Sequence, residues 1–148
     1  MRPAALRAFV EKAGPVFDVI LLDTAAGLGA PFEAARAVAQ RALLVLTPDP
    51  IATRDGKIVC DALTAGGCAE IRLLLNQVPP TLENCGVRDL DECIDTVGAQ
   101  LIGVVPFSDE IRRAGFTGTP LSPRGRPRFV LRAIAARLCG RHIPLVIR

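Results

Sequence analysis

The sequence predicts an α/β domain built on a mostly parallel sheet with flanking helices. Four short apolar runs alternate with segments whose apolar residues recur at helical spacing, a pattern typical of right-handed βαβ units. Hydrophobic residues make up 50% of the 148 positions, which is enough for one substantial core. No repeat, low-complexity tract or linker interrupts the chain, so residues 1–148 are interpreted as one domain or most of one.

The first elements expected along the chain are a helix and a strand. Leu6, Phe9 and Val10 fall at helical spacing and predict a helix within residues 1–14. The run 19–22 is apolar at every position, which predicts a strand covered on both faces of a parallel sheet. The helix is therefore expected to lead directly into the first strand.

Three further strands and five further helices are expected downstream. The strands are the apolar runs at 42–46, 71–76 and 101–105. The helices, each with apolar residues on one face, are expected at 31–40, 53–64, 90–97, 109–114 and 128–138. Proline and glycine mark surface loops, one holding Pro79, Pro80 and Gly86 and the other at 119–128.

An acidic residue and a flexible turn follow the first predicted strand. Ligands of open parallel sheets bind beyond the carboxyl ends of the strands, so Asp23 is expected where a cation or phosphate chain can lie. The residues after it are small, and Gly27 lets a backbone amide approach a ligand closely. The plainer alternative is a buried strand followed by a capping aspartate.

The segment FDVILLDTAAG at 17–27 resembles the switch II segment of the MinD/ParA group of P-loop ATPases. The resemblance continues in the same order through ALLVLTPDPIATRDG (42–56), IRLLLNQV (71–78) and LIGVVPFSDEIRRAGFTGTPL (101–121). These segments look closer to the MinD branch, which positions the bacterial cell-division site, than to the chromosome-partitioning ParA branch. The resemblance implies a P-loop NTPase-like fold, ATP and Mg²⁺ as cofactors, and nucleotide-dependent dimers.

The phosphate-binding loop of that family is not found in these 148 residues. No G-x-x-x-x-G-K-[ST] occurs, and the only Gly-Lys pair, Gly56-Lys57, is followed by Ile58. The family carries its deviant Walker A loop, with two lysines, ahead of switch II. The chain therefore resembles the C-terminal portion of such a domain, incomplete at its N-terminal part. We expect that it does not hydrolyse ATP by itself, and whether it acts as an enzyme stays open.

The missing loop also bears on the sheet. In the resembled fold, the phosphate-loop strand lies between the strand that ends at Asp23 and the strand that ends at Leu46. Neighbouring strands are about 4.8 Å apart, so these two are expected to stand roughly 9.6 Å apart or to pair directly. We expect the chain to be marginally stable unless the sheet closes up or another polypeptide supplies the strand.

The resemblance assigns roles to five residues. Asp23 is implied as the catalytic, magnesium-facing carboxylate, and the Gly27 amide as the sensor of the γ-phosphate. Asn76 is implied to hydrogen-bond adenine, and Pro106 and Asp109 to lie in the loop along the base. Without the resemblance, an asparagine after a strand is usually a turn former.

Plainer roles are also available for the other polar residues near the predicted site. Ser108 or Asp109 could act as the N-cap of the following helix. Asp49 lies near the presumed site, but no chemistry is assigned to it. His142 has no neighbouring ligand set in the sequence, and a surface role is expected.

Charge is distributed unevenly along the chain. Residues 1–111 carry 15 acidic and 9 basic side chains, a net charge of −6, whereas residues 112–148 carry nine arginines and no acid. A basic end of this kind can approach anionic lipid or nucleic acid. The candidate is the amphipathic stretch 128–138; the alternative is an ordinary core helix with arginines at its rim. Nucleic-acid binding is not expected, because the arginines are not interleaved with aromatic residues.

Five cysteines, an odd number without a C-x-x-C pair, favour a reduced, cytoplasmic protein, peripheral at the membrane if the basic end binds lipid. No 18-residue apolar run and no secretion leader are present in the sequence. The leading interpretation is the C-terminal part of a MinD-like cell-division ATPase. The alternatives are a non-catalytic subunit that pairs with an intact relative, and a fragment of a ParA-like or flagellar-number-regulating ATPase.

Overall fold

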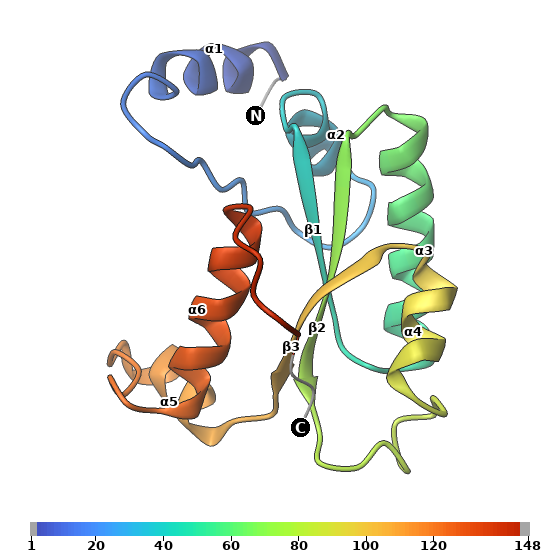
Figure 1. Ribbon diagram of the computed structural model, residues 1–148. Coiled ribbons are helices and arrows are strands. Elements are labelled where there is room, and N and C mark those ends of the chain that lie inside the picture. Colours follow the sequence, from blue (N-terminus) through green and yellow to red (C-terminus); the bar gives the residue numbers. More distant parts are fainter. Residues whose placement is uncertain (1–2, 146–148) are drawn as a thin grey trace.

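The computed structural model describes residues 3–145, which contain three strands and six helices (Figure 1). The elements alternate along the chain in the expected βαβ manner. Their order is α1 (Pro3–Ala13), α2 (Ala30–Arg36), β1 (Arg41–Leu46), α3 (Pro50–Ala65), β2 (Glu70–Val78), α4 (Leu90–Val97), β3 (Gln100–Pro106), α5 (Asp109–Thr117) and α6 (Arg126–Leu138). The predicted α/β class is confirmed.

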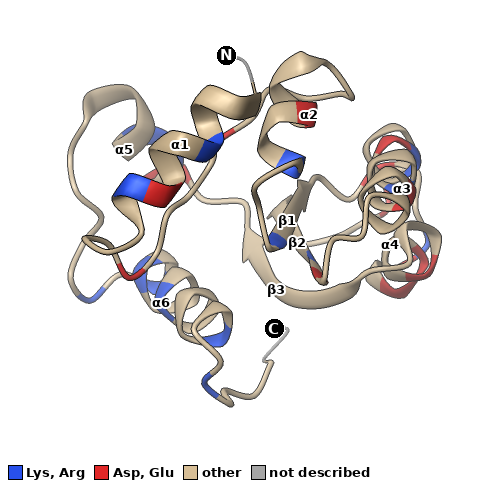
Figure 2. Cartoon of the chain, turned by 90° about the horizontal axis from the view of Figure 1, so that it is seen from above, with Lys and Arg blue, Asp and Glu red and all other residues tan. Residues whose placement is uncertain are grey.

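The three strands form one parallel sheet in the order β1-β2-β3. Pairing of β1 with β2 is regular from Arg41↔Glu70 to Leu46↔Leu75. Pairing of β2 with β3 contains two register shifts, one of them between Leu75 and Val78 at the end of β2. Helices α3 and α4 lie on one side of the sheet and α6 on the other, as Figures 1 and 2 show.

Two apolar clusters hold the layers together. On the α3 and α4 side, the side chains of Leu73, Leu75, Cys93 and Val97 are fully buried. On the opposite side, the buried residues are Leu74, Ile102 and Val105 of the sheet and Ile134 of α6. The apolar stripe of α6 therefore packs on the sheet, which confirms the core-helix alternative for this stretch.

The predicted strand at 19–22 is wrong. The segment between α1 and α2 has no strand assignment, and both Val19 and Leu21 are exposed, at 62% and 86%. A β-strand needs a neighbour for its backbone amides and carbonyls, and in the described part of the chain this segment pairs with none. It has neither joined β1 directly nor formed an isolated strand.

Some helices begin or end at other residues than the sequence predicted, because capping residues set their ends. α3 begins at Pro50 rather than at residue 53, because Asp49 caps it and proline suits the first turn. α5 continues to Thr117, where Gly118 in the left-handed region ends it. α2 is shorter than expected and ends at Arg36. Apolar periodicity finds the body of a helix, whereas the capping residues set its ends.

Two further findings concern the cysteines and the length of the helices. All five cysteines are free thiols. Within residues 3–145, none of the helices is both long enough and apolar enough to cross a membrane.

Candidate functional site

The end of β2 carries the residues with the clearest marks of a binding position. Asn76 is half-buried, and within residues 3–145 no hydrogen-bond partner is found for its side chain. The next residue, Gln77, has a φ of 54°, which is uncommon for a residue other than glycine. Strained backbone of this kind gathers at functional sites. Sequence analysis missed Gln77, because glutamine is not a residue type that signals a left-handed turn.

The end of β3 lies beside the end of β2. Pro106 pairs with Val78, and the amide of Phe107 donates a hydrogen bond of 2.8 Å to the Val78 carbonyl. A cavity of about 170 Å³ adjoins this loop. It is lined by Pro106, Phe107, Ser108, Ile111, Arg126, Pro127 and Val130. Two of the predicted site residues, Asn76 and Pro106, therefore lie near the ends of neighbouring strands, at one end of the sheet.

The first residues of α5 have structural partners. The hydroxyl oxygen of Ser108 accepts a hydrogen bond of 3.4 Å from the Ile111 amide, so Ser108 is the N-cap. Asp109 accepts a hydrogen bond of 2.7 Å from Arg112, and both side chains are exposed. The side chain of Asp109 is thus engaged within its own helix. A contact with a base through its backbone stays a prediction.

The end of β1 is fixed by an aspartate to which no chemistry was assigned. The Asp49 carboxylate accepts hydrogen bonds from the Thr47 hydroxyl at 2.5 Å and from the amides of Ile51 and Ala52 at 3.1 and 2.9 Å. The Ala52 amide and the Thr47 hydroxyl hold the pKa of Asp49 below its ordinary value. The Asp-Pro pair that opens α3 is a sequence signal for this cap.

The loop after β2 folds back onto the same end of the molecule. Gly86 approaches Pro50 so closely that a Cβ on the glycine would lie 3.1 Å from the proline ring. The carboxylate of Asp89 then caps α4 by accepting a hydrogen bond of 2.8 Å from the Glu92 amide. The connections that follow all three strands therefore meet at the carboxyl end of the sheet, the lower end in Figure 1.

Asp23 and Gly27 are not brought to these strand ends. Both residues are exposed in the segment between α1 and α2, and Gly27 has a φ of 90°. Figure 1 shows this segment, in blue, crossing well above the loops that follow β2 and β3. Among residues 3–145 this segment has no partner strand that would fix its direction. The roles of Asp23 and Gly27 stay predictions.

The residues present fit the base of a nucleotide better than its phosphates. The free amide of Asn76 suits the edge of a purine base, which offers both donors and acceptors. For the phosphates, the chain holds no glycine-rich loop with its lysine. Within residues 3–145 no group of three or more His, Cys, Asp or Glu side chains could hold a metal. Mg²⁺ is usually bound through one or two carboxylates together with substrate phosphates.

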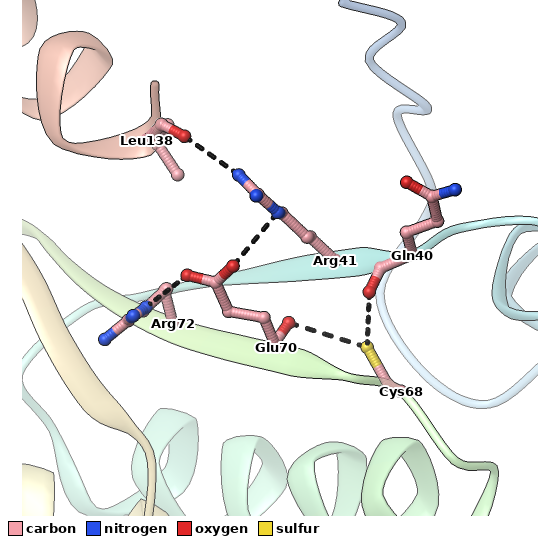
Figure 3. A network of polar contacts seen from close by, with 6 residues as sticks. All are labelled: Gln40, Arg41, Cys68, Glu70, Arg72 and Leu138. Atoms are coloured by element: carbon pink, nitrogen blue, oxygen red, sulfur yellow. Dashed lines mark hydrogen bonds and ion pairs between the residues drawn. The ribbon is translucent and has the colours of Figure 1, made fainter. Parts of the chain in front are cut away.

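The opposite end of the sheet holds a polar network with a structural function (Figure 3). Glu70 accepts a hydrogen bond of 2.8 Å from Arg72 and forms an ion pair of 3.0 Å with Arg41. Arg41 also donates to the Leu138 carbonyl at 3.1 Å. The Arg72 hydrogen bond, aided by the charge of Arg41, keeps the pKa of Glu70 below its ordinary value. The network ties the start of β1 and β2 to the end of α6.

Arg137 anchors the chain after α6 at the same end. Its guanidinium donates to the carbonyls of Ile102, Ile143 and Pro144 at 2.9, 2.9 and 2.7 Å. A cavity of about 230 Å³, lined mainly by basic and polar side chains including Arg72 and His142, lies beside it. His142 is exposed at its rim, as expected for a surface residue.

Comparison with known proteins gives one consistent result. No family model matches the chain. Curated relatives include the septum site-determining protein MinD of Synechocystis sp., 31% identical over 95% of this chain and 54% of the relative. MinD of Bacillus subtilis is 29% identical over 98% and 56%, and MinD of Thermotoga maritima is 32% identical over 97% and 55%. The chain spans about half the length of these relatives.

Solved structures show the same fold. MinD of Aquifex aeolicus superposes with a TM-score of 0.90 at 23% identity, over 99% of this chain and 64% of that one. MinD in the Aquifex aeolicus MinC:MinD complex gives 0.89 at 23%, over 99% and 63%. MinD of Pyrococcus horikoshii with Mg-ADP gives 0.79 at 23%, over 92% and 56%. At these identities the likeness concerns the fold.

Proposed function

The chain belongs to the MinD/ParA family, and on this basis we propose that it forms the base-binding side of a MinD-type nucleotide site in a protein that places the cell-division site. Its relatives are named septum site-determining proteins. One observation carries the nucleotide part of the proposal. The Asn76 amide is unpartnered within residues 3–145 and lies near the end of β2, at the sheet end where the Pro106 loop begins. In this proposal the amide reads the edge of adenine, and the backbone from Pro106 to Asp109 lies along the ring.

The phosphate side of the proposed site is incomplete in these 148 residues. Phosphoryl transfer depends on positioned cations and amides around the phosphates, and the lysine-bearing loop that supplies them in the family is not in the sequence. The chain alone therefore binds nucleotide weakly and does not turn over ATP. In an assembled site, Asp23 faces the magnesium ion and the Gly27 amide faces the γ-phosphate.

Assembly with a second protein is part of the proposal. A solved relative forms a MinC:MinD complex, so surfaces of this fold engage partners. The chain acts either within a MinD-like homodimer or as a non-catalytic subunit beside an intact relative. Phe129, at 61% exposure, lies outside the buried stripe of α6, as do the exposed Arg128 and Arg132. These are the residues we assign to peripheral membrane contact.

Nucleotide binding can be tested on the purified full chain by NMR titration with Mg-ADP. We expect chemical-shift changes at the Asn76 and Phe107 amides with a dissociation constant of roughly 1 mM or larger. The affinity is expected to be low because the chain contacts only the base. The variant Asn76→Ala should lose these shifts. Asn84 is exposed in the loop after β2, and Asn84→Ala is the matched control, which should keep the shifts.

Two results would overturn this assignment. Shifts that persist unchanged in Asn76→Ala would remove the base contact. ATP turnover by the purified chain, abolished by Asp23→Ala, would show that the phosphates are positioned after all.

A further inference from the structure

A cavity of about 230 Å³ lies at the amino end of the sheet, opposite the end proposed to hold the base. Its polar lining comes from the starts of β2 and β3, from the end of α6 and from the segment after α6, and none of the described residues around it is acidic. We call this hollow the basic cavity. The polar residues that line it are Arg72, Gln100, Arg137, Arg141 and His142.

The wall of the basic cavity is held in place by the chain itself. Gly140, with a φ of 79°, follows α6 and turns the chain back. Arg137 then fixes the returning segment, because its guanidinium donates to two carbonyls of that segment and to the Ile102 carbonyl of β3. The backbone of Arg141 and His142 is therefore held beside the start of β3. A preorganised wall of this kind keeps the entropic cost of binding a ligand low.

Several N–H groups around the basic cavity lack an acceptor in the protein. The Nε atom of Arg72 donates to Glu70, but in the part of the chain that the structure describes its two terminal nitrogens have no acceptor. The side chains of Gln100 and Arg141 likewise have no hydrogen-bond partner among residues 3–145. Guanidinium groups match the oxygens of carboxylates and phosphates in both charge and geometry. The free donors therefore favour an anion.

The positive charge around the basic cavity is only partly neutralised. Figure 3 shows the Glu70 carboxylate between Arg41 and Arg72, so one negative charge is shared by two positive ones. Arg137 donates only to carbonyls, and Arg141 forms no ion pair with any of residues 3–145. Like charges gathered at one place repel each other, and a bound anion relieves this repulsion.

Size and direction narrow the choice of anion. Sites for drug-sized ligands hold roughly 300 to 1,000 Å³, so this cavity suits a smaller group. Its free donors come from β2, from β3 and from the segment after α6, and a tetrahedral phosphate accepts hydrogen bonds from several directions at once. We propose that the basic cavity binds a phosphate group, with Arg72, Arg141 and the Gln100 amide as its donors. The site does not depend on the proposed base contact, which lies at the other end of the sheet.

Phosphate binding can be tested on the purified full chain by NMR titration with inorganic phosphate. A reference titration with chloride at equal ionic strength separates binding from screening. We expect saturable chemical-shift changes at the amides of 100–102 and 141–143, with a dissociation constant of roughly 1 mM. The Asn76 amide should not shift, because inorganic phosphate carries no base.

Three variants at exposed positions locate the contact. Gln100→Glu places a carboxylate in the basic cavity and should abolish the changes, because it repels the phosphate. Arg141→Gln removes one charged donor and should weaken binding about tenfold. Arg113→Gln is the matched control: Arg113 is an exposed arginine of α5 whose side chain has no partner among residues 3–145, and its loss should leave the affinity unchanged.

Cosedimentation with phosphatidylcholine vesicles that contain phosphatidic acid identifies the source of the phosphate. If a lipid headgroup supplies it, Gln100→Glu should sediment less than the wild type, and inorganic phosphate should compete with the vesicles. If the phosphate is free in solution, Gln100→Glu and the wild type should sediment alike. The proposal fails if phosphate gives no saturable change beyond that of chloride, if Arg141→Gln binds as tightly as the wild type, or if Arg113→Gln loses as much affinity as Arg141→Gln.

Discussion

β2 and β1 are neighbouring strands with similar apolar sequences, yet their surroundings differ. β2 has a strand on each side and helices over both faces, and Leu73 and Leu75 are 0% exposed. β1 has one strand neighbour, and only Leu44, which faces α3 and α4, is buried among its large side chains. Hydrophobicity of the run is therefore not what decides burial. The number of neighbours decides it.

The two strands should respond very differently to the loss of a side chain. Leu75→Ala removes fully buried methyl groups and should lower the free energy of unfolding by about 2 to 5 kcal/mol. Val45→Ala removes methyl groups that are half in water already, and should cost well under about 1.5 kcal/mol. Urea unfolding followed by far-UV circular dichroism measures both. Similar losses for the two variants would show that the Val45 side chain is covered in solution.

α6 packs closely on β3 at Gly103. A Cβ on Gly103 of β3 would lie 2.5 and 2.9 Å from the Cγ1 and Cδ1 atoms of Ile134. Gly103→Ala should therefore cost about 1 to 3 kcal/mol, because the strand or the buried Ile134 side chain would have to shift to admit the Cβ. Thermal unfolding measures the loss.

Two further variants show whether the loss of stability comes from crowding against Ile134 or from replacing any glycine with alanine. Gly115 of α5 has no heavy atom within 4 Å of its added Cβ, so Gly115→Ala should stabilise by up to about 1 kcal/mol. Ile134→Ala removes both crowding atoms, so Gly103→Ala should cost less in an Ile134→Ala background than in the wild type. If Gly103→Ala costs the same in both backgrounds, the tight contact with α6 is not the cause.

The contrast between β1 and β2 also explains which parts of the fold could be predicted. Three of the four expected strands exist, because each apolar run lies beside a neighbouring strand supplied by the same chain. The run at 19–22 has equally strong strand character but no neighbour, so no strand forms. A local pattern predicts the ability to form a strand, and a non-local partner decides whether it does.

The same reasoning applies to the candidate site. Asn76 and Pro106 could be placed together from the sequence, because parallel strands bring their carboxyl ends to one edge. Asp23 could not, since the rule holds only for a residue that follows a real strand. The left-handed backbone at Gln77 had no signal in the sequence, because it coincides with a register shift between β2 and β3 rather than with a glycine.

The end of β1 is followed by the Asp49 cap, whose carboxylate accepts hydrogen bonds from Thr47, Ile51 and Ala52. Asp49→Ala removes the acceptor for the Ile51 and Ala52 amides and should lower the free energy of unfolding by about 1 kcal/mol, while Asp49→Asn, also a good cap, should cost less. The pKa of Asp49 is lower in the folded state than in the unfolded state. The stability gained from its ionisation is therefore complete at a pH above the unfolded-state pKa, about 3.9, and is lost as the pH falls through the folded-state pKa. The gap between wild type and Asp49→Asn should therefore narrow as urea titrations move from pH 6 to pH 3. A gap that stays constant over this range would mean that the carboxylate charge contributes nothing to the cap.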